Sequence, residues 1–206
     1  DRQINLLLQE TYEQLDEKIK NEDVSIERVT KGIQITLRGN LFQSMKANVN
    51  KSYVPIIQEI SKIIEDCRLF NIESSKQYSS LLTFLEQGNQ ELNVEIRCEG
   101  HTDDAILPPK SDYRNNWELS SARSLRVVNI MNDASTISEK YFSYNGYGEF
   151  RPLINVSGID DFQKKRQARA YNRRVEIYLD AFARPKTRSS EDEFLKMLNS
   201  KFKKGE

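Results

Sequence analysis

The residues whose types suit chemistry gather between positions 98 and 126. His101, the only histidine of the chain, stands close to the carboxylates of Asp103 and Asp104. A histidine beside carboxylates can hold a metal ion or act as a general base. Arg123 follows in the same segment and offers a permanent positive charge. This concentration predicts a functional site, and the neighbouring residues decide which kind.

Metal and catalytic chemistry find little support in the rest of the sequence. A catalytic zinc site usually takes about three protein ligands, and no second histidine is present to help His101. Cys67 and Cys98 are not in a Cys-x-x-Cys pair and cannot make a zinc site by themselves. Ser120 and Ser121 lie in a segment with helical periodicity and have no assigned base. We therefore expect no catalytic residue, no metal ion and no cofactor.

The two cysteines leave two interpretations open. Each falls on the apolar side of its segment, so both are expected to point into the core. In an oxidising compartment Cys67 and Cys98 could form a disulfide, which would stabilise the fold by roughly 3 to 4 kcal/mol through the loop that it closes. In a reducing compartment they would be two reduced core thiols.

Composition limits the classes of function. The 206 residues suit one domain with extensions and can bury a substantial core. Lysine and arginine together number 31, as do aspartate and glutamate, so no net charge draws the chain to nucleic acid or anionic lipid. No apolar run approaches the roughly eighteen residues that a membrane span needs. Because the sequence begins at Asp1 without a methionine, an anchor or signal segment could precede it.

The chain opens with an amphipathic helical pattern, and we treat residues 1–22 as a linker helix. Its apolar face could pack on the domain, pair with a second copy of the chain, or continue into a preceding segment. The residues of this face recur at spacings of three and four: Leu8, Tyr12, Leu15 and Ile19.

Alternation and periodicity then predict an α+β domain over residues 23–182. Alternating apolar and polar residues predict strands at 24–30, 32–38, 92–99, 141–147 and 174–179. Helical spacing of apolar residues predicts helices at 52–66 and 117–132, with a short additional helix inside an insertion at 66–90. Asn115 or Asn116 is expected as N-cap of the second helix. A basic loop is expected at 151–171, and residues 183–206 are expected to form a tail with a short helix.

Several short motifs occur in order along this domain, and together they resemble those of the OmpA-like peptidoglycan-binding domain. The Asn-Trp-Glu-Leu-Ser form resembles the MotB branch of that family, the stator subunits. The motifs are Leu41-Phe42-Gln43-Ser44, Glu99-Gly100-His101-Thr102-Asp103, Asn116-Trp117-Glu118-Leu119-Ser120-Ser121-Ala122-Arg123, Gly146-Tyr147-Gly148 and Asn172-Arg173-Arg174-Val175-Glu176-Ile177. The sequence departs from the family pattern in the length of 66–90, in Pro108-Pro109 and in the long basic stretch before Asn172.

The resemblance implies a βαβαββ sandwich, with a mixed sheet, helices packed on one face and helical extensions at both termini. It also implies a site for the diaminopimelate of a peptidoglycan stem peptide, which presents an ammonium and a carboxylate. Asp103 would bind the ammonium, and the Arg123 guanidinium would bind the carboxylate through a bidentate pair of hydrogen bonds. Thr102, Asn116 and Arg173 match further ligand-binding positions, with Asn116 either touching the ligand or holding the loop.

Five other motif residues are expected to shape this site rather than to touch the ligand. By the resemblance, His101 orients the loop that carries Asp103. The remaining four are expected to form the pocket or the core: Asp104, Trp117, Leu119 and Tyr147.

The resemblance favours a non-catalytic module that anchors a stator or ion-channel subunit, of a flagellar or a defence motor, to the cell wall. The alternative is a structural protein that ties the outer membrane to peptidoglycan. The first function implies a periplasmic domain, a segment in the inner membrane outside this sequence, a membrane-embedded MotA-like partner and a homodimer. Two copies on one polymer would raise an affinity that is modest for a single stem peptide.

Overall fold

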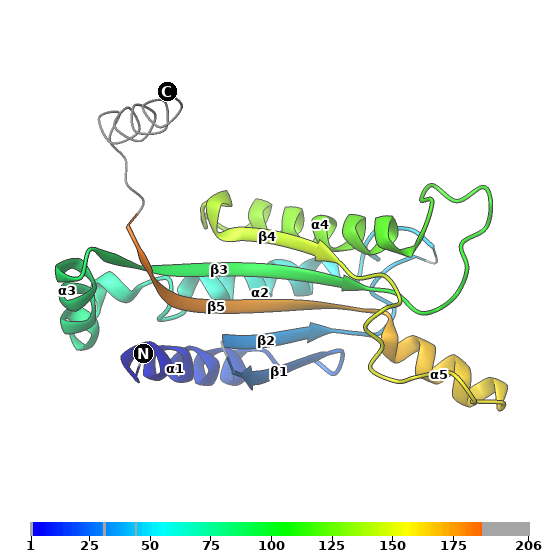
Figure 1. Ribbon diagram of the computed structural model, residues 1–206, viewed down its shortest axis with the longest axis horizontal. Helices are drawn as coiled ribbons and strands as arrows, with labels where there is room; N and C mark the ends of the chain where they lie inside the picture. Colours follow the sequence, from blue (N-terminus) through cyan, green and yellow to red (C-terminus); the bar gives the residue numbers. More distant parts are fainter. Residues whose placement is uncertain (1, 31, 44, 187–206) are drawn as a thin grey trace, which may run out of the picture.

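A five-stranded mixed sheet forms the centre of the protein (Figure 1). The computed structural model describes residues 2–30, 32–43 and 45–186. Along the sheet the order is β1-β2-β5-β3-β4, with β3 and β4 parallel and the other neighbours antiparallel. The prediction of an α+β fold with a mixed sheet is confirmed. The strands are β1 Val24–Val29, β2 Gly32–Leu37, β3 Gln90–His101, β4 Phe142–Gly146 and β5 Arg174–Pro185.

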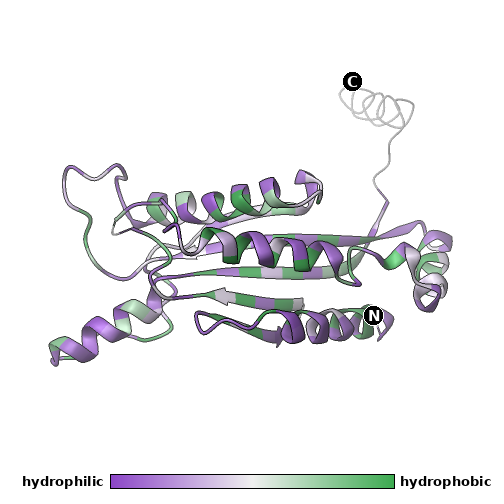
Figure 2. Ribbon diagram, turned by 180° about the vertical axis from the view of Figure 1, so that it is seen from behind, coloured by the Kyte–Doolittle hydropathy of each residue, from purple (hydrophilic) through white to green (hydrophobic). Residues whose placement is uncertain are grey.

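Three helices pack with one face of the sheet and share its hydrophobic core, as the figures show from opposite sides (Figures 1 and 2). They are α1 Arg2–Lys18, α2 Val54–Asp66 and α4 Asn116–Ala134. Helix α3, Ser79–Gln87, lies at one end of the sheet, and α5, Phe162–Asn172, projects from the other (Figure 1). Two short 3₁₀ helices, Ile72–Ser74 and Lys76–Tyr78, precede α3, so the predicted insertion at 66–90 is helical.

The core face of the sheet follows the alternation in the sequence. Successive side chains of a strand point to opposite faces, so every second residue enters the core. The apolar members of this alternation are buried, as predicted: Ile33, Ile35, Leu37, Val94, Ile96, Cys98, Val175, Ile177 and Leu179. The opposite face, expected to be wet, is partly buried, because Thr36 pairs across the sheet with Glu176 and both are nearly inaccessible.

Helix α1 packs on its own domain, which was the first of the three alternatives for its apolar face. Leu7, Leu8 and Leu15 are at most 2% exposed and belong to the same core cluster as the sheet. Tyr12 and Ile19 are only partly buried at the edge of this cluster. The leucines that could have paired with a second copy are therefore already covered.

The apolar side of α4 was predicted to consist of Leu119, Ala122, Leu125, Val128 and Ile130, and Leu119, Val128 and Ile130 are indeed buried. Leu125 is 36% exposed, whereas Ser120, Arg123 and Ser124 are buried. Small residues lie toward the sheet because the helix approaches the strands too closely for larger ones. The N-cap is Asn115, whose side-chain oxygen accepts a hydrogen bond from the Glu118 amide at 3.0 Å.

The largest error in the sequence prediction is α5, which was expected to be a loop. Its residues give no apolar stripe, and only Ala168 and Asn172 are buried. The helix is instead started by Asp161, whose side chain accepts a hydrogen bond from the Lys164 amide at 2.7 Å. Strand β5 continues to Pro185, beyond the predicted boundary at 182. Most of the predicted tail, 187–206, lies outside the described residues.

Cys67 and Cys98 are both buried free thiols, so the disulfide that the sequence allowed is not formed. Burial raises the pKa of Cys67 to about 11 and that of Cys98 to about 12. Both thiols therefore belong to the core as protonated apolar groups of low reactivity. Within the described part of the chain, no helix has the length and apolarity to cross a membrane.

Candidate functional site

A cavity of about 710 Å³ lies between the loop after β2, the loop after β3, the start of α4 and the end of α5. Its wall is partly apolar, with Leu41, Phe42 and Leu119, and partly charged. The structure brings together at this cavity all five residues that the sequence predicted to bind ligand: Thr102, Asp103, Asn116, Arg123 and Arg173.

Two glycines allow α4 to lie directly on the strands and so to aim its residues at the cavity. A Cβ at Gly100 would come within 2.1 Å of the Ser120 carbonyl oxygen, and one at Gly146 would come within 2.3 Å of the Ser121 amide nitrogen. Any larger residue at these positions would push the helix away. Asn116 and Arg123 are seven residues apart, about two helical turns, and therefore share the face that lines the cavity.

The loop after β3 is held in place by hydrogen bonds at both ends. The Thr102 amide donates to the Gly148 carbonyl at 2.9 Å, and the Ala105 amide donates to the Asp103 carboxylate at 3.1 Å. Asn116 Nδ2 donates to the carbonyls of Ala105 at 3.1 Å and Asp103 at 3.4 Å. Asn116 therefore holds the loop, and its contact with a ligand stays a prediction.

Thr102 is buried at the cavity wall with its hydroxyl free. The residue is 3% exposed, and Oγ1 has no hydrogen-bond partner among the described residues. A buried hydroxyl without a hydrogen-bond partner lowers the stability of the fold unless another group supplies the missing hydrogen bond. Its position on the lining makes a ligand atom in the cavity a suitable partner.

Asp103, which was expected to take the ammonium of the ligand, forms an ion pair with Arg173. Arg173 Nη1 lies 2.5 Å from Asp103 Oδ2. The Arg173 side chain is 42% exposed, so solvent weakens this ion pair and leaves the arginine able to turn toward a ligand. The sequence could not give this pairing, because it depends on the path of the segment between β4 and β5.

Arg123 is the buried cation of the cavity. It is 4% exposed, its Nε donates to the Lys46 carbonyl at 3.0 Å, and its guanidinium lies 4.8 Å from the centroid of the Phe42 ring. No carboxylate lies within ion-pair distance of it among the described residues. Burial lowers the pKa of Arg123 to about 10, against the opposing effect of Asp103, so it stays charged near neutral pH. A carboxylate that entered the cavity would meet a guanidinium that has no ion-pair partner among the described residues.

Three of the residues expected to shape the pocket lie beside the cavity. Leu119 is part of the lining. Asp104 is instead turned to α5, where Arg169 donates to it at 2.6 and 3.0 Å and lowers its pKa. Trp117 stacks on Phe150 with ring centroids 5.0 Å apart, outside the lining. The last two predictions need correction, because partners on α5 and on the loop after β4 draw these side chains away.

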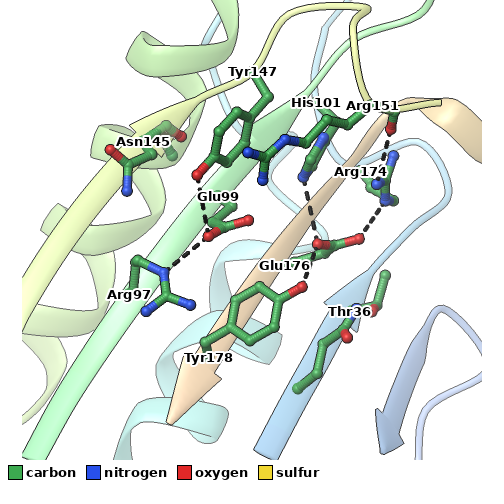
Figure 3. Close-up of polar contacts among 12 residues, drawn as sticks. Thr36, Arg97, Glu99, His101, Asn145, Tyr147, Arg151, Arg174, Glu176 and Tyr178 are labelled. Carbon is green, nitrogen blue, oxygen red and sulfur yellow. Dashed lines mark hydrogen bonds and ion pairs between the residues drawn. The ribbon is translucent and has the colours of Figure 1, made fainter. Parts of the chain in front are cut away.

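His101 and Tyr147 also lie outside the lining, on the polar face of the sheet (Figure 3). Their rings stack with centroids 5.5 Å apart, and His101 Nε2 is 3.4 Å from a carboxylate oxygen of Glu176. The side chain of His101 points to this face because strand alternation puts it opposite Gly100. These two residues stabilise the strands behind the site rather than shape the cavity.

Glu99, His101 and Glu176 place their potential ligand atoms within 4.8 Å of one another, which is the spacing of a metal site. Each carboxylate, however, already accepts a hydrogen bond from a guanidinium: Arg97 Nε reaches Glu99 at 2.8 Å, and Arg174 Nε reaches Glu176 at 2.6 Å (Figure 3). The negative charges are thus balanced within the protein. The cluster fits an internal ionic network that joins β3 to β5 better than an ion site.

The helix serines are committed to structural hydrogen bonds. Ser120 Oγ donates to the Trp117 carbonyl at 3.0 Å and accepts from the Gly148 amide at 2.9 Å. Ser124 Oγ donates to the Asn145 carbonyl at 2.9 Å and so fastens α4 to β4. Neither hydroxyl has a histidine or carboxylate as base, and the arrangement fits a nucleophile poorly.

Sequence reasoning missed part of the cavity wall. Phe42 was noted within a motif, but its contact with Arg123 was not foreseen. Arg166, Ala170 and Tyr171 line the cavity from α5, the helix that was expected to be a loop. The signals that could have revealed α5 are Asp161 as an N-cap and the run of good helix formers after it.

Comparison with known proteins gives a consistent set of relatives. The model of the OmpA family matches residues 70–166. Motility protein B of Bacillus subtilis (strain 168) is 28% identical over 178 residues, which cover 84% of this chain and 56% of that protein. The chain spans about half the length of the curated relatives it matches.

Two solved structures share the fold. The periplasmic domain of Helicobacter pylori MotB has a TM-score of 0.57 and 22% identity, covering 89% of this chain and 91% of that chain. The cell wall anchor of the T6SS from Pseudomonas aeruginosa has a TM-score of 0.57 and 23% identity, covering 84% and 97%. At these identities the likeness extends to the fold alone.

Proposed function

Because this chain carries an OmpA-family domain and is homologous to motility protein B, we propose that it binds peptidoglycan and anchors a MotB-type stator subunit to the cell wall. The binding is non-catalytic, since the charged residues of the cavity are suited to hold a ligand and the serines near it are engaged elsewhere. The fold shared with the periplasmic domain of Helicobacter pylori MotB supports a periplasmic location.

The observation that carries the proposal is the buried guanidinium of Arg123, which has no ion-pair partner among the described residues. A charge is normally buried only with a partner, so a site of this kind is suited to an anionic ligand group. The carboxylate of diaminopimelate would pair with Arg123, and its ammonium would join Asp103 beside Arg173. Each sheltered, charge-assisted hydrogen bond contributes about 1.5 to 3 kcal/mol to binding.

Firm anchoring requires more than one such contact. We expect a homodimer in which two copies hold one polymer, because a second site on the same ligand multiplies the effective affinity. The complete protein would be fixed in the inner membrane by a segment outside this sequence and would act with a membrane-embedded MotA-like partner. Co-purification of the full-length protein with that partner from detergent tests this assembly.

A motor subunit is better supported than a tether between outer membrane and wall. The relative that covers most of this chain is a motility protein, and the matched structures include MotB. The cell wall anchor of the T6SS, which has the same fold, shows that wall anchoring by this architecture is not limited to one machine. Loss of swimming on deletion of the gene, or loss of phage resistance with motility intact, separates the flagellar from the defence role.

Cosedimentation with purified sacculi tests the binding site. Arg123→Ala is expected to lower affinity by roughly tenfold to a hundredfold, because about 1.5 to 3 kcal/mol of charge-assisted contact is lost. Arg126→Ala removes an exposed arginine of the same helix and is the matched control. Both variants should keep the circular-dichroism spectrum of the unaltered chain. Full retention of sacculus binding by Arg123→Ala would refute the site.

A further inference from the structure

Helix α5 is a concentrated positive surface that the contacts at Arg123 do not use. It carries Lys164, Lys165, Arg166 and Arg169 within eleven residues and has no acidic residue. Arg169 is paired with Asp104, but no ion pair of the other three occurs among the described residues. The net charge of zero therefore hides a local excess of positive charge, which a neutral composition had seemed to exclude.

The position of this helix relates its charge to the cavity. Arg166, Ala170 and Tyr171 line the cavity, so α5 is one of its walls. Arg166 and Ala170 are four residues apart and share one face of the helix. Lys164 is seven residues, about two turns, before Tyr171 and lies on the same side as that residue, and Lys165 lies one turn before Arg169. From the cavity the helix projects past the end of the sheet, away from α1 and α3 (Figure 1). A polymer whose side branch fills the cavity would lie alongside α5.

We propose that α5 is a second contact surface for peptidoglycan, on which Lys164 and Lys165 bind carboxylates of a stem peptide next to the one held in the cavity. This inference rests on the proposed function of the cavity. The guanidinium of Arg123 is a fixed, bidentate hydrogen-bond donor that suits one carboxylate in one orientation. Lys164 is exposed and Lys165 is partly exposed. Such lysines are flexible point charges that suit carboxylates whose positions vary along a cross-linked polymer.

The contacts of α5 should differ from those of the cavity in strength and in their dependence on salt. A single exposed lysine–carboxylate contact is weak and is screened by salt. Contacts made alongside an already bound stem peptide are intramolecular, so several weak ones raise the affinity for the polymer. A single soluble stem peptide that fills the cavity supplies no neighbouring stem peptide for these lysines to bind. Helix α5 therefore acts on binding to the wall and leaves binding of the isolated stem peptide unchanged.

The test compares two double variants of the full chain. Lys164→Gln with Lys165→Gln removes charge from α5. Lys62→Gln with Lys76→Gln removes the same charge from exposed positions on α2 and near α3, and serves as control. Each protein is titrated with a soluble stem peptide and with sacculi stripped of phosphate-containing polymers. The α5 variant is expected to bind stem peptide normally and stripped sacculi about five- to tenfold more weakly at low salt, with the difference shrinking at high salt.

The possible outcomes distinguish binding by α5 from binding by the cavity. Unchanged binding of stripped sacculi by the α5 variant would overturn the inference, as would an equal loss in the control variant. A loss confined to sacculi that retain phosphodiester polymers would also overturn it, because the helix would then bind phosphate. Failure of the unaltered chain to bind soluble stem peptide would instead contradict the proposed function of the cavity, and the inference with it.

Discussion

Arg123 shows how a single buried charge can serve binding at some cost to stability. Its guanidinium has an aromatic ring and one carbonyl as neighbours, but no carboxylate within ion-pair distance in the described part of the chain. Burial lowers its pKa to about 10, which means that the folded protein disfavours the charged form. Such local conflicts are typical of functional sites.

Replacing Arg123 by methionine should therefore separate stability from binding. Methionine fills a similar volume without a charge, so Arg123→Met is expected to raise the free energy of unfolding by about 1 kcal/mol. The same variant should lose sacculus binding. Urea denaturation measures the first effect, with Arg126→Met as the exposed control. A large loss of stability in Arg123→Met would show that the arginine is a structural residue.

Glu176 governs a different property, the response to acid. Burial by itself raises the pKa of Glu176, but the contacts with His101, Arg174 and Tyr178 outweigh it and lower the pKa to about 2. A carboxylate whose pKa is lower in the folded state stabilises the fold above its unfolded pKa and loses this effect as pH falls. The contribution of Glu176 should therefore disappear between about pH 4.5 and pH 2.

Comparison of Glu176→Gln with the unaltered chain tests this pH dependence. Glutamine keeps the shape of the side chain but cannot be charged. The variant should be less stable at pH 7, and the difference in free energy of unfolding should narrow steadily as the pH is lowered from 4.5 toward 2. A difference that is independent of pH would contradict the ionic role of Glu176.

At the scale of single residues, the sequence predicted which residues lie together at the cavity but not which of them form ion pairs. Motif positions brought Thr102, Asp103, Asn116, Arg123 and Arg173 to one cavity, as the structure shows. The pairing of Asp103 with Arg173 depends on loops whose course no local pattern encodes. The same reason applies to Asp104 and Trp117, whose partners lie on segments that the sequence left unstructured.

The helices and strands of the fold differ in how clearly the sequence pattern predicts them. Strands β2 and β3 alternate regularly, and helix α2 has a clear apolar face, so these three were predicted within about two residues of their observed bounds. The start of β5 was predicted as well, but the strand continues six residues beyond its predicted end at 179. Helix α5 has almost no buried residue and could not be found from periodicity. The contact face of α4 was predicted only in part: Leu119, Val128 and Ile130 are buried as expected. The serines that pack against the strands beside Gly100 and Gly146 were not predicted to do so.

Helix α1 offers a direct test of its own packing. Leu7 is fully buried and its neighbour Leu6 is 50% exposed. Leu7→Ala should lower the free energy of unfolding by about 2 to 5 kcal/mol, because it leaves a cavity in the core. Leu6→Ala changes the same residue type on the outer face and should stay within about 0.5 kcal/mol. Equal effects of the two variants would mean that α1 is not docked as described.

For the molecule as a whole, the arrangement suits a domain that is held at one end. The cavity and α5 lie at one end of the long sheet, and α1 begins toward the opposite end, near α3 (Figure 1). One face of the sheet is covered by α1, α2 and α4, and the other carries the ionic network around Glu176 (Figures 2 and 3). Antiparallel pairing of β3 with β5 along twelve residue pairs connects the two ends.

Calorimetric titration of two stem peptides into two proteins tests the central claim most directly. One peptide carries the free diaminopimelate carboxylate and the other carries it as an amide; the proteins are the unaltered chain and Arg123→Ala. If Arg123 binds that carboxylate, amidation should weaken binding to the unaltered chain by about 1.5 to 3 kcal/mol and should have little effect on Arg123→Ala. Equal affinity of the unaltered chain for both peptides would contradict the account.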